Sequence, residues 1–251
     1  MRPVTVRTIK IGEGRPKICV PIVEAEKEGI LAQAAALRGL PLDMAEWRAD
    51  WYQDVQDISR VVDTVRELRK VLGDLPLLFT IRTAAEGGAV KMAAEAYAEL
   101  CAAVARSGYA DLIDVEVFTA RETAEDIVRE VHRAGAKVVA SNHDFHKTPP
   151  KEELLRRFRH MEALGADIWK IAVMPQNGRD VLTLLDATLT MTEAEDCSPV
   201  ISMSMAALGA VSRLSGEVFG SAVTFAAAGR ASAPGQISVD KMSEMLDILR
   251  I

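Results

Sequence analysis

The segment ADIWKIAV, residues 166–173, has the composition of a buried β-strand with one charged residue, Lys170, at its centre. An ammonium group inside an apolar strand is costly to bury unless it is paired or gives up its proton. One interpretation is that Lys170 extends to the surface or closes an ion pair. The other is that it is an amine nucleophile that forms a Schiff base with a ketone. The rest of the sequence has to distinguish the two.

Composition describes an ordinary globular protein. The 251 residues suit one large α/β barrel or two small domains, and 49% hydrophobic with 26% charged residues can build a full core. A net charge of -6 argues against a nucleic-acid partner. The three cysteines are widely spaced without a Cys-x-x-Cys pair, which predicts neither disulfides nor a zinc site and fits a cytoplasmic protein. No signal peptide and no run of about 20 apolar residues is visible, so we expect no membrane segment.

Short apolar runs alternate with longer amphipathic stretches along the chain. The predicted strands are Lys17 to Val23, Leu42 to Arg48, Leu77 to Thr83, Leu112 to Phe118, Lys137 to Ser141, Ala166 to Val173, Val200 to Ser204 and Ser221 to Ala226. The predicted helices are Lys27 to Arg38, Val55 to Leu72, Lys91 to Ser107, Glu122 to Ala134, Lys151 to Leu164, Asp180 to Glu195, one from about Ala206, and Val239 to Leu249.

About eight β-then-α units in a chain of this length predict an α/β fold, a (β/α)8 TIM barrel forming a single domain over residues 1–251. A doubly wound open sheet is the alternative, but its glycine-rich turn after the first strand is missing. The residues before Pro16 are expected to form a short hairpin over the bottom of the barrel.

Polar residues gather at the carboxyl ends of the predicted strands, where barrel active sites lie. They are Glu46, Arg48, Arg82, Glu86, Asp114, Glu116, His143, Lys170, Arg213, Ser232 and Gln236. Each alone has an ordinary explanation, such as a structural ion pair, a surface arginine or a solvated loop residue. Under the same reasoning Met203 and Met205 are assigned to the core, and His132, His146 and His160 to structural or surface positions. The polar residues listed first occur together at nearly every predicted strand end, which favours a functional site.

The types of these residues restrict the chemistry. Arginines bind a small carboxylated substrate, a buried lysine suits a ketone, and a histidine oriented by a glutamate suits proton transfer near neutral pH. No metal-ligand spacing, P-loop or dinucleotide motif occurs, so neither metal nor cofactor is expected. The arginines, the buried lysine and the histidine with its glutamate together predict imine-assisted proton abstraction at the carbon next to a ketone.

The sequence resembles the type I 3-dehydroquinate dehydratases, Schiff-base enzymes of the shikimate pathway. The matching segments follow one another over nearly the whole chain: EWRAD (46–50), LLFTIRTAAEGG (77–88), SNHDFHKTP (141–149), KIAVMPQ (170–176), ISMSM (201–205), SRLSGEVFGSAVTF (212–225) and ASAPGQIS (231–238).

The resemblance implies a barrel that converts 3-dehydroquinate to 3-dehydroshikimate by syn loss of water. Lys170 would form the imine, His143 would transfer protons and Glu86 would hold His143. The substrate-binding residues implied are Glu46, Arg48, Arg82 and Arg213, with Ser232 and Gln236 in a lid. Asp114 and Glu116 would keep the arginines and the lysine aligned. The family is commonly homodimeric, so a homodimer is expected.

Four positions depart from relatives in this family. Pro21 stands where some members carry a serine that touches the substrate, Trp169 replaces a proline before the lysine, and Ala206 with Ala207 replaces a more polar pair. None is a catalytic group, so they bear on affinity rather than on the reaction.

Two other functions stay open from the sequence. A class I aldolase would share the lysine and the barrel but would usually bind phosphate after the seventh or eighth strand, where residues 231–236 give no clear phosphate site. An inactive homologue that senses a small acid would be expected to lack Lys170 or His143, and both are present.

Overall fold

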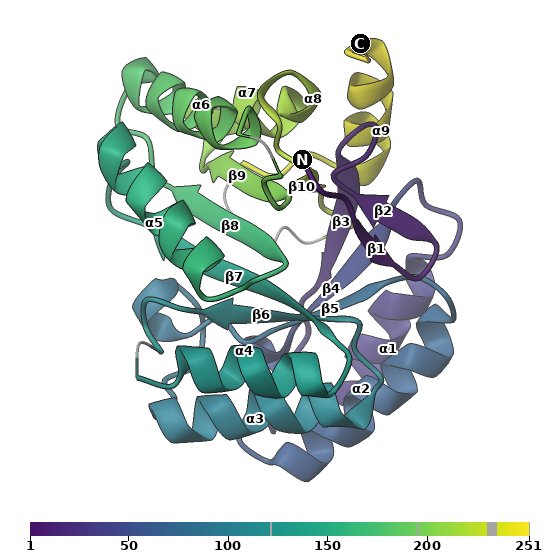
Figure 1. The fold of residues 1–251 in the computed structure, drawn as a ribbon. Coiled ribbons are helices and arrows are strands. Elements are labelled where there is room, and N and C mark those ends of the chain that lie inside the picture. Colours follow the sequence, from purple (N-terminus) through teal and green to yellow (C-terminus); the bar gives the residue numbers. More distant parts are fainter. Residues whose placement is uncertain (121, 195, 230–234, 251) are drawn as a thin grey trace.

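The computed structural model describes residues 1–120, 122–194, 196–229 and 235–250 (Figure 1). Within these residues, eight parallel strands form one sheet in the order β10-β3-β4-β5-β6-β7-β8-β9. The strands are β3 (Lys17–Ile22), β4 (Met44–Arg48), β5 (Leu77–Thr80), β6 (Leu112–Glu116), β7 (Lys137–Asp144), β8 (Ile168–Val173), β9 (Val200–Ser204) and β10 (Val223–Phe225). The predicted (β/α)8 barrel is confirmed.

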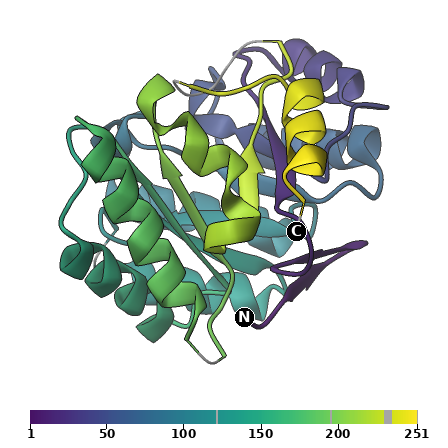
Figure 2. The ribbon, with the colours of Figure 1, turned by 90° about the horizontal axis from the view of Figure 1, so that it is seen from above.

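The sheet curls round until its edge strands meet. Val200 of β9 forms an isolated parallel bridge with Ser221, two residues before β10, so the barrel is nearly closed. Parallel strands need crossover connections, and helices on the outside of the sheet supply them (Figures 1 and 2). They are α1 (Lys27–Ala36), α2 (Ile58–Leu72), α3 (Ala94–Ser107), α4 (Ala124–Arg133), α5 (Lys151–Ala163), α6 (Gly178–Thr192), α7 (Ala210–Leu214), α8 (Gly216–Phe219) and α9 (Val239–Ile248).

The helices begin and pack as their sequences require. In α2 the side chain of Asp57 accepts hydrogen bonds from the first-turn amides of Ser59 and Arg60, and in α6 Asn177 caps the first turn in the same way. Val61, Val65 and Leu68 recur at helical spacing and are fully buried against the sheet. The single helix expected from Ala206 is instead two short ones, α7 and α8. Residue 195, the expected end of α6, lies outside the described residues.

Two apolar layers lie on the two faces of the sheet. Outward residues such as Trp47, Phe79 and Trp169 pack between the strands and the helices. Inward residues near the start of each strand, such as Leu78 and Ile168, fill the lower barrel. Because side chains alternate along each strand, outward residues pack under the helices and inward residues fill the barrel. The polar inward residues lie above the apolar inward layer, nearer to the carboxyl ends of the strands.

The predicted N-terminal hairpin is present. β1 (Val4–Val6) pairs antiparallel with β2 (Ile9–Ile11). Val6 and Ile11 are buried and pack with the apolar residues of the lower barrel. Arg7 donates to Asp111, just before β6, at 2.6 Å. The hairpin thus covers the bottom of the barrel, opposite to the ends of the strands that carry the polar residues.

Candidate active site

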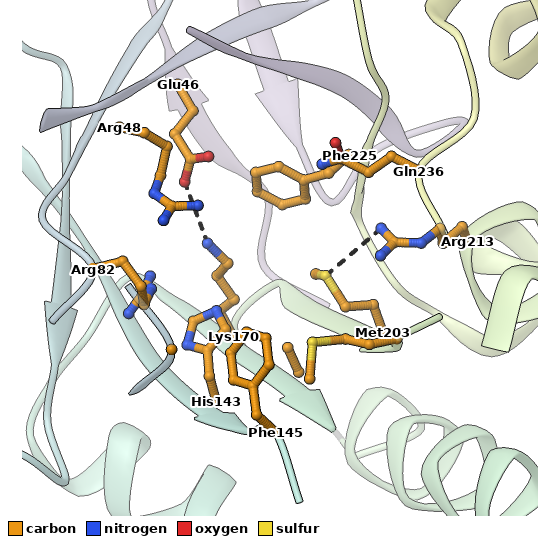
Figure 3. A pocket seen from close by; sticks show the side chains of 13 residues that line it. Glu46, Arg48, Arg82, His143, Phe145, Lys170, Met203, Arg213, Phe225 and Gln236 are labelled. Atoms are coloured by element: carbon orange, nitrogen blue, oxygen red, sulfur yellow. Dashed lines mark hydrogen bonds and ion pairs between the residues drawn. The ribbon is translucent and has the colours of Figure 1, made fainter. Parts of the chain in front are cut away.

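The polar strand ends converge on one cavity of about 170 Å³ at the carboxyl end of the barrel (Figure 3). Its lining residues are Glu46, Arg48, Arg82, Gly87, His143, Phe145, Lys170, Ala172, Met203, Met205, Arg213, Phe225 and Gln236. Most of the residues singled out from the sequence are among them. Glu86, Asp114 and Glu116 lie directly behind the lining, and Ser232 lies outside the described residues.

Lys170 is buried, with 3% of its surface exposed, and its amine lies inside the barrel. Nζ donates to Asp114 Oδ2 at 3.2 Å and lies 3.5 Å from Glu46 Oε1. It also lies 4.6 Å from the centre of the Phe225 ring. The amine does not reach the protein surface, so the interpretation that Lys170 extends to the surface is wrong. It is both ion-paired and turned towards the cavity.

Asp114 and Glu116 hold Arg82 from below. Arg82 Nη2 donates to Asp114 Oδ1 at 2.8 Å, and Nη1 donates to Glu116 Oε1 at 2.8 Å and to Ser141 Oγ at 3.0 Å. Burial alone would raise the pKa of Asp114, but Arg82 and then Lys170 outweigh it, so this pKa is lowered. Asp114 is therefore a shared anion between the arginine and the lysine.

His143 and Glu86 form a hydrogen-bonded pair beside Lys170. Glu86 Oε2 lies 2.9 Å from His143 Nδ1 and also accepts the His143 backbone N–H at 2.9 Å. Burial, reinforced by Glu116, raises the pKa of Glu86 to about 8. Burial, reinforced by the cations Arg82, Lys170 and Arg48, lowers the pKa of His143 well below its usual range. The site thus favours a neutral imidazole at neutral pH, as a general base requires.

The first predicted arginine, Arg48, is fixed by a residue outside the predicted site, Asp50. Arg48 donates to both oxygens of Asp50, at 2.7 and 2.8 Å. Asp50 also accepts the backbone amides of Arg82 and Ala89, at 3.3 and 3.1 Å. This buried carboxylate therefore orients Arg48 and ties down the loop that carries Glu86. The motif EWRAD contained Asp50, but nothing in its spacing indicated this second contact.

Arg213 enters the cavity from the opposite side to Arg48 and Arg82, next to Gln236 (Figure 3). It sits in α7, is buried, and its Nη1 lies 3.9 Å from Met203 Sδ. Burial lowers the pKa of Arg213 to about 10. A guanidinium in these surroundings gains from an incoming carboxylate, so the two sides of the cavity present cations to an anionic ligand.

Apolar residues complete the cavity at positions outside the predicted site. Met203 and Met205 are buried in the apolar cluster of the barrel, as expected, and they also line the cavity; they stand two apart on the inward face of β9 and just beyond it. Phe145 stacks beside His143 and covers Gly87, where a Cβ would lie 2.3 Å from its ring. Gly87 also has φ of 80°, so glycine is required there on two grounds.

The other histidines lie elsewhere, as expected. His146 is exposed, His132 pairs with Asp167 at 2.8 Å, and His160 packs against Phe118. β7 runs on to Asp144, so His143 lies within a strand and not in the loop predicted after it. In the parallel pairing of β7 with β8, His143 stands opposite Ala172.

Comparison with known proteins places this geometry in a family. The family model described as type I 3-dehydroquinase matches residues 18–251. The chain belongs to the type I 3-dehydroquinase family. Membership makes it a hydro-lyase and rules out the aldolase alternative. Proteins named 3-dehydroquinate dehydratase from Listeria welshimeri and Bacillus licheniformis are each 50% identical, over 99% and 98% of this chain and 98% and 97% of their own lengths.

Solved type I 3-dehydroquinase structures superpose closely. The enzyme from Clostridium difficile, crystallised with covalently modified comenic acid, has a TM-score of 0.96 at 48% identity and covers 99% of this chain and 98% of its own. The enzyme from Geobacillus kaustophilus gives 0.95 at 41% identity, with 99% and 96% covered. At 16% identity, 3-hexulose-6-phosphate synthase from Salmonella typhimurium, with a TM-score of 0.57, shares the fold alone.

Neither a metal cluster nor a membrane helix is found in the part of the chain that the structure describes. No group of three or more His, Cys, Asp or Glu side chains there could hold a metal ion. No helix there is long and apolar enough to cross a membrane.

Proposed function

We propose that the chain removes water from 3-dehydroquinate, giving 3-dehydroshikimate by syn elimination through a Schiff base on Lys170. The observation that carries this proposal is the buried amine of Lys170 opening into a cavity beside the His143–Glu86 pair. The relatives named above, and the covalent ligand in the Clostridium difficile enzyme, support it. The proposed site also includes Glu46, Arg48, Arg82, Arg213, Ser232 and Gln236.

The reaction begins with attack of the Lys170 amine on the substrate ketone. Loss of one water from the adduct gives a protonated imine, which attracts electrons from the adjacent carbon more strongly than the ketone does. Asp114 and Glu46, within 3.5 Å of Nζ, stabilise the positive charge. The Phe225 ring at 4.6 Å contributes in the same sense.

His143 Nε2 then takes the proton from that adjacent carbon, and the electron pair of the C–H bond moves into the imine to give an enamine. Glu86 keeps Nε2 unprotonated beforehand by accepting the Nδ1–H at 2.9 Å. The enamine expels the neighbouring hydroxyl, which leaves as water with the proton from His143. Hydrolysis consumes one water, releases the enone product and restores Lys170, so one water is eliminated overall.

Cations on both sides of the cavity position the substrate. Arg213 binds the carboxylate, and Glu46, Arg48 and Arg82 hold the ring hydroxyls and the carboxylate. Gln236 lines the cavity, and Ser232, which lies outside the described residues, is proposed to belong to the same lid. Met203, Met205 and Phe145 cover the apolar edge of the ring and keep bulk water from the enamine.

The test mixes the purified protein with 3-dehydroquinate in the presence of EDTA and follows the ultraviolet absorbance of the conjugated enone. Borohydride is then added with substrate, and the modified residue is located by mass. Enone formed despite EDTA, with a reduced adduct on Lys170, is the expected result. Ligand-dependent stabilisation without turnover would instead identify a sensor, and an adduct without enone would indicate another keto acid.

The wider setting of the enzyme is also a proposal. We infer a cytoplasmic enzyme of the shikimate pathway, made of one barrel domain over residues 1–251, that works as a homodimer. Three buried cysteines without disulfides suit a reducing compartment. Leu208, Val211 and Val218 are each about half exposed on η3 (Ala207–Gly209), α7 and α8, and offer an apolar surface to a second copy. Val211→Glu should then lower the mass measured by sedimentation.

A further inference from the structure

A chain of hydrogen bonds links the outer helix α5 to His143. Arg157 Nη1 donates to Asn142 Oδ1 at 2.7 Å, and Asn142 Nδ2 donates to Glu86 Oε1 at 3.2 Å. The other oxygen of Glu86 accepts from His143 Nδ1 at 2.9 Å. An arginine more than ten residues beyond the histidine is thus connected to it through two intervening side chains.

The arginine fixes which way the Asn142 amide points. A guanidinium has only donors, so the amide oxygen must face Arg157 and the amide nitrogen must face Glu86. The reverse orientation would place two donors against each other and an amide oxygen against a carboxylate. The positive charge also polarises the amide and strengthens its N–H as a donor. Arg157 therefore makes Asn142 an obligate donor to Glu86.

We infer that Arg157 is a positioning residue for the dehydration: through Asn142 it holds the Glu86 carboxyl aimed at His143. The inference rests on the proposed role of the Glu86–His143 pair. Neither Arg157 nor Asn142 lines the cavity, so neither touches the substrate. Both act on the reaction only by what they do to Glu86.

Arg157 is itself held in place. Its Nε donates to Glu153 Oε1 at 2.8 Å, one turn earlier in α5, and only 17% of its side chain is exposed. Arg156 binds the same carboxylate, at 2.7 and 2.8 Å, from the solvent side. Hydrogen bonds from Arg156 and Arg157 lower the pKa of Glu153 to about 2, so the anion that anchors Arg157 persists throughout the working range.

Several charges meet at the Glu86–His143 pair, and each is part of the expected pH response. Arg82 at the end of β5 lowers the pKa of Glu86, whereas Glu116 and Asp114 on β6 raise it. Lys170 on β8 and Arg48 on β4 join Arg82 in lowering the pKa of His143. The hydrogen bond from Asn142 lowers the pKa of Glu86. Weakening that bond therefore moves the deprotonation of the pair to higher pH.

The experiment measures the pH dependence of kcat and of kcat/KM for Arg157→Met, which keeps the length of the side chain and loses its donors. Arg156→Met is the matched control, since Arg156 shares Glu153 but has no contact with Asn142. We expect the acid limb of Arg157→Met to move up by roughly half a pH unit to one unit. Below the limb this is a loss of about three- to tenfold in kcat, with KM unchanged. Arg157→Lys should recover part of the shift.

A double variant tests whether the effect passes through Asn142. In an Asn142→Ala background, Arg157→Met should shift the limb no further, because the connecting amide is gone. Asn142→Asp offers a second measurement if Arg157→Met does not fold. It keeps an acceptor for Arg157 but turns an oxygen towards Glu86, and it should move the limb upward by more than Arg157→Met does.

The outcomes separate cleanly. A wild-type limb in Arg157→Met, an equal shift in Arg156→Met, a further shift in the double variant, or a wild-type limb in Asn142→Asp would each overturn the inference. Borohydride trapping on Lys170 should be normal in Arg157→Met, because imine formation does not depend on Glu86. If wild-type protein traps no substrate on Lys170, the proposed function fails, whatever the pH profiles show.

Discussion

Asp114 Oδ2 accepts a hydrogen bond from Lys170 Nζ at 3.2 Å, while Oδ1 of the same fully buried carboxylate accepts one from Arg82 at 2.8 Å. A carboxylate shared in this way compensates part of the charge of two cations inside the barrel, and Glu116 and Glu46 add to it. Removing one partner from a buried ionic group leaves an uncompensated charge, which costs far more than loss of a surface pair.

Asp114→Asn should lower the free energy of unfolding by about 3 kcal/mol at pH 7, measured by urea denaturation. The lowered pKa of Asp114 gives a stabilisation that is present above its unfolded pKa and lost as pH falls through the folded value. The difference from wild type should therefore shrink in acid. Asp126→Asn, which alters an exposed pair with Arg129, is the control and should change stability by less than about 1 kcal/mol.

Lys170→Ala should abolish imine formation and most turnover, because no other amine lines the cavity among the described residues. Binding of the product carboxylate should survive, since Arg48 and Arg213 remain in place. Mass spectrometry after borohydride and titration calorimetry with product are the two measurements. Normal turnover by this variant would remove Lys170 from the mechanism.

His143→Ala should still form an imine that borohydride traps, but it should stall before elimination. The imidazole acts only after the carbon–nitrogen bond exists, and general acid–base groups contribute about 10²- to 10⁴-fold. The expected signature is a full-mass adduct on Lys170 with a loss of kcat in this range. If no adduct forms, His143 must also assist the addition or dehydration step.

The acid limb of kcat/KM belongs to the Glu86–His143 pair as a unit. The pKa of Glu86 is raised to about 8, so activity should rise with pH until the pair has lost its proton near there. Glu86→Gln removes this carboxyl and leaves His143, whose pKa is lowered by burial and by Arg82. The limb should then move to lower pH, while kcat falls by about ten- to a hundredfold.

The same Glu86 shift carries a prediction for stability. A carboxyl whose folded pKa is raised stabilises the protein below its unfolded pKa, and that stabilisation is lost as pH rises through the folded value. Between about pH 4.5 and about pH 8 the wild type should therefore lose stability relative to Glu86→Gln. An unchanged difference between the two proteins across this window would contradict the raised pKa.

Much of the barrel could be predicted because strand periodicity places the residues. Glu46 with Arg48, and Asp114 with Glu116, stand two apart and therefore share the inward face of their strands. Parallel strands then bring these faces to one end without further information. The alternation of residues along the strands, and the polar residues that interrupt the apolar pattern, were enough to locate this part of the site.

What escaped prediction depends on contacts between distant segments. Met203 has the composition of a core residue, and only its height on β9 makes it a cavity wall. Asp50 acts through backbone amides of a loop that no spacing links to it. Asn142 lies one position from His143, so alternation alone assigns it to the outer face. Its role depends on Arg157, which reaches it from the next helix.

Among the described residues, the hairpin of β1 and β2 closes the lower end of the barrel. Val6 and Ile11 fill this end, so we expect a ligand of the cavity to enter and leave on the side above Lys170. Entry at one end of the barrel and release at the other is therefore not expected. In the proposed reaction, the product therefore leaves through the same opening by which the reactant enters.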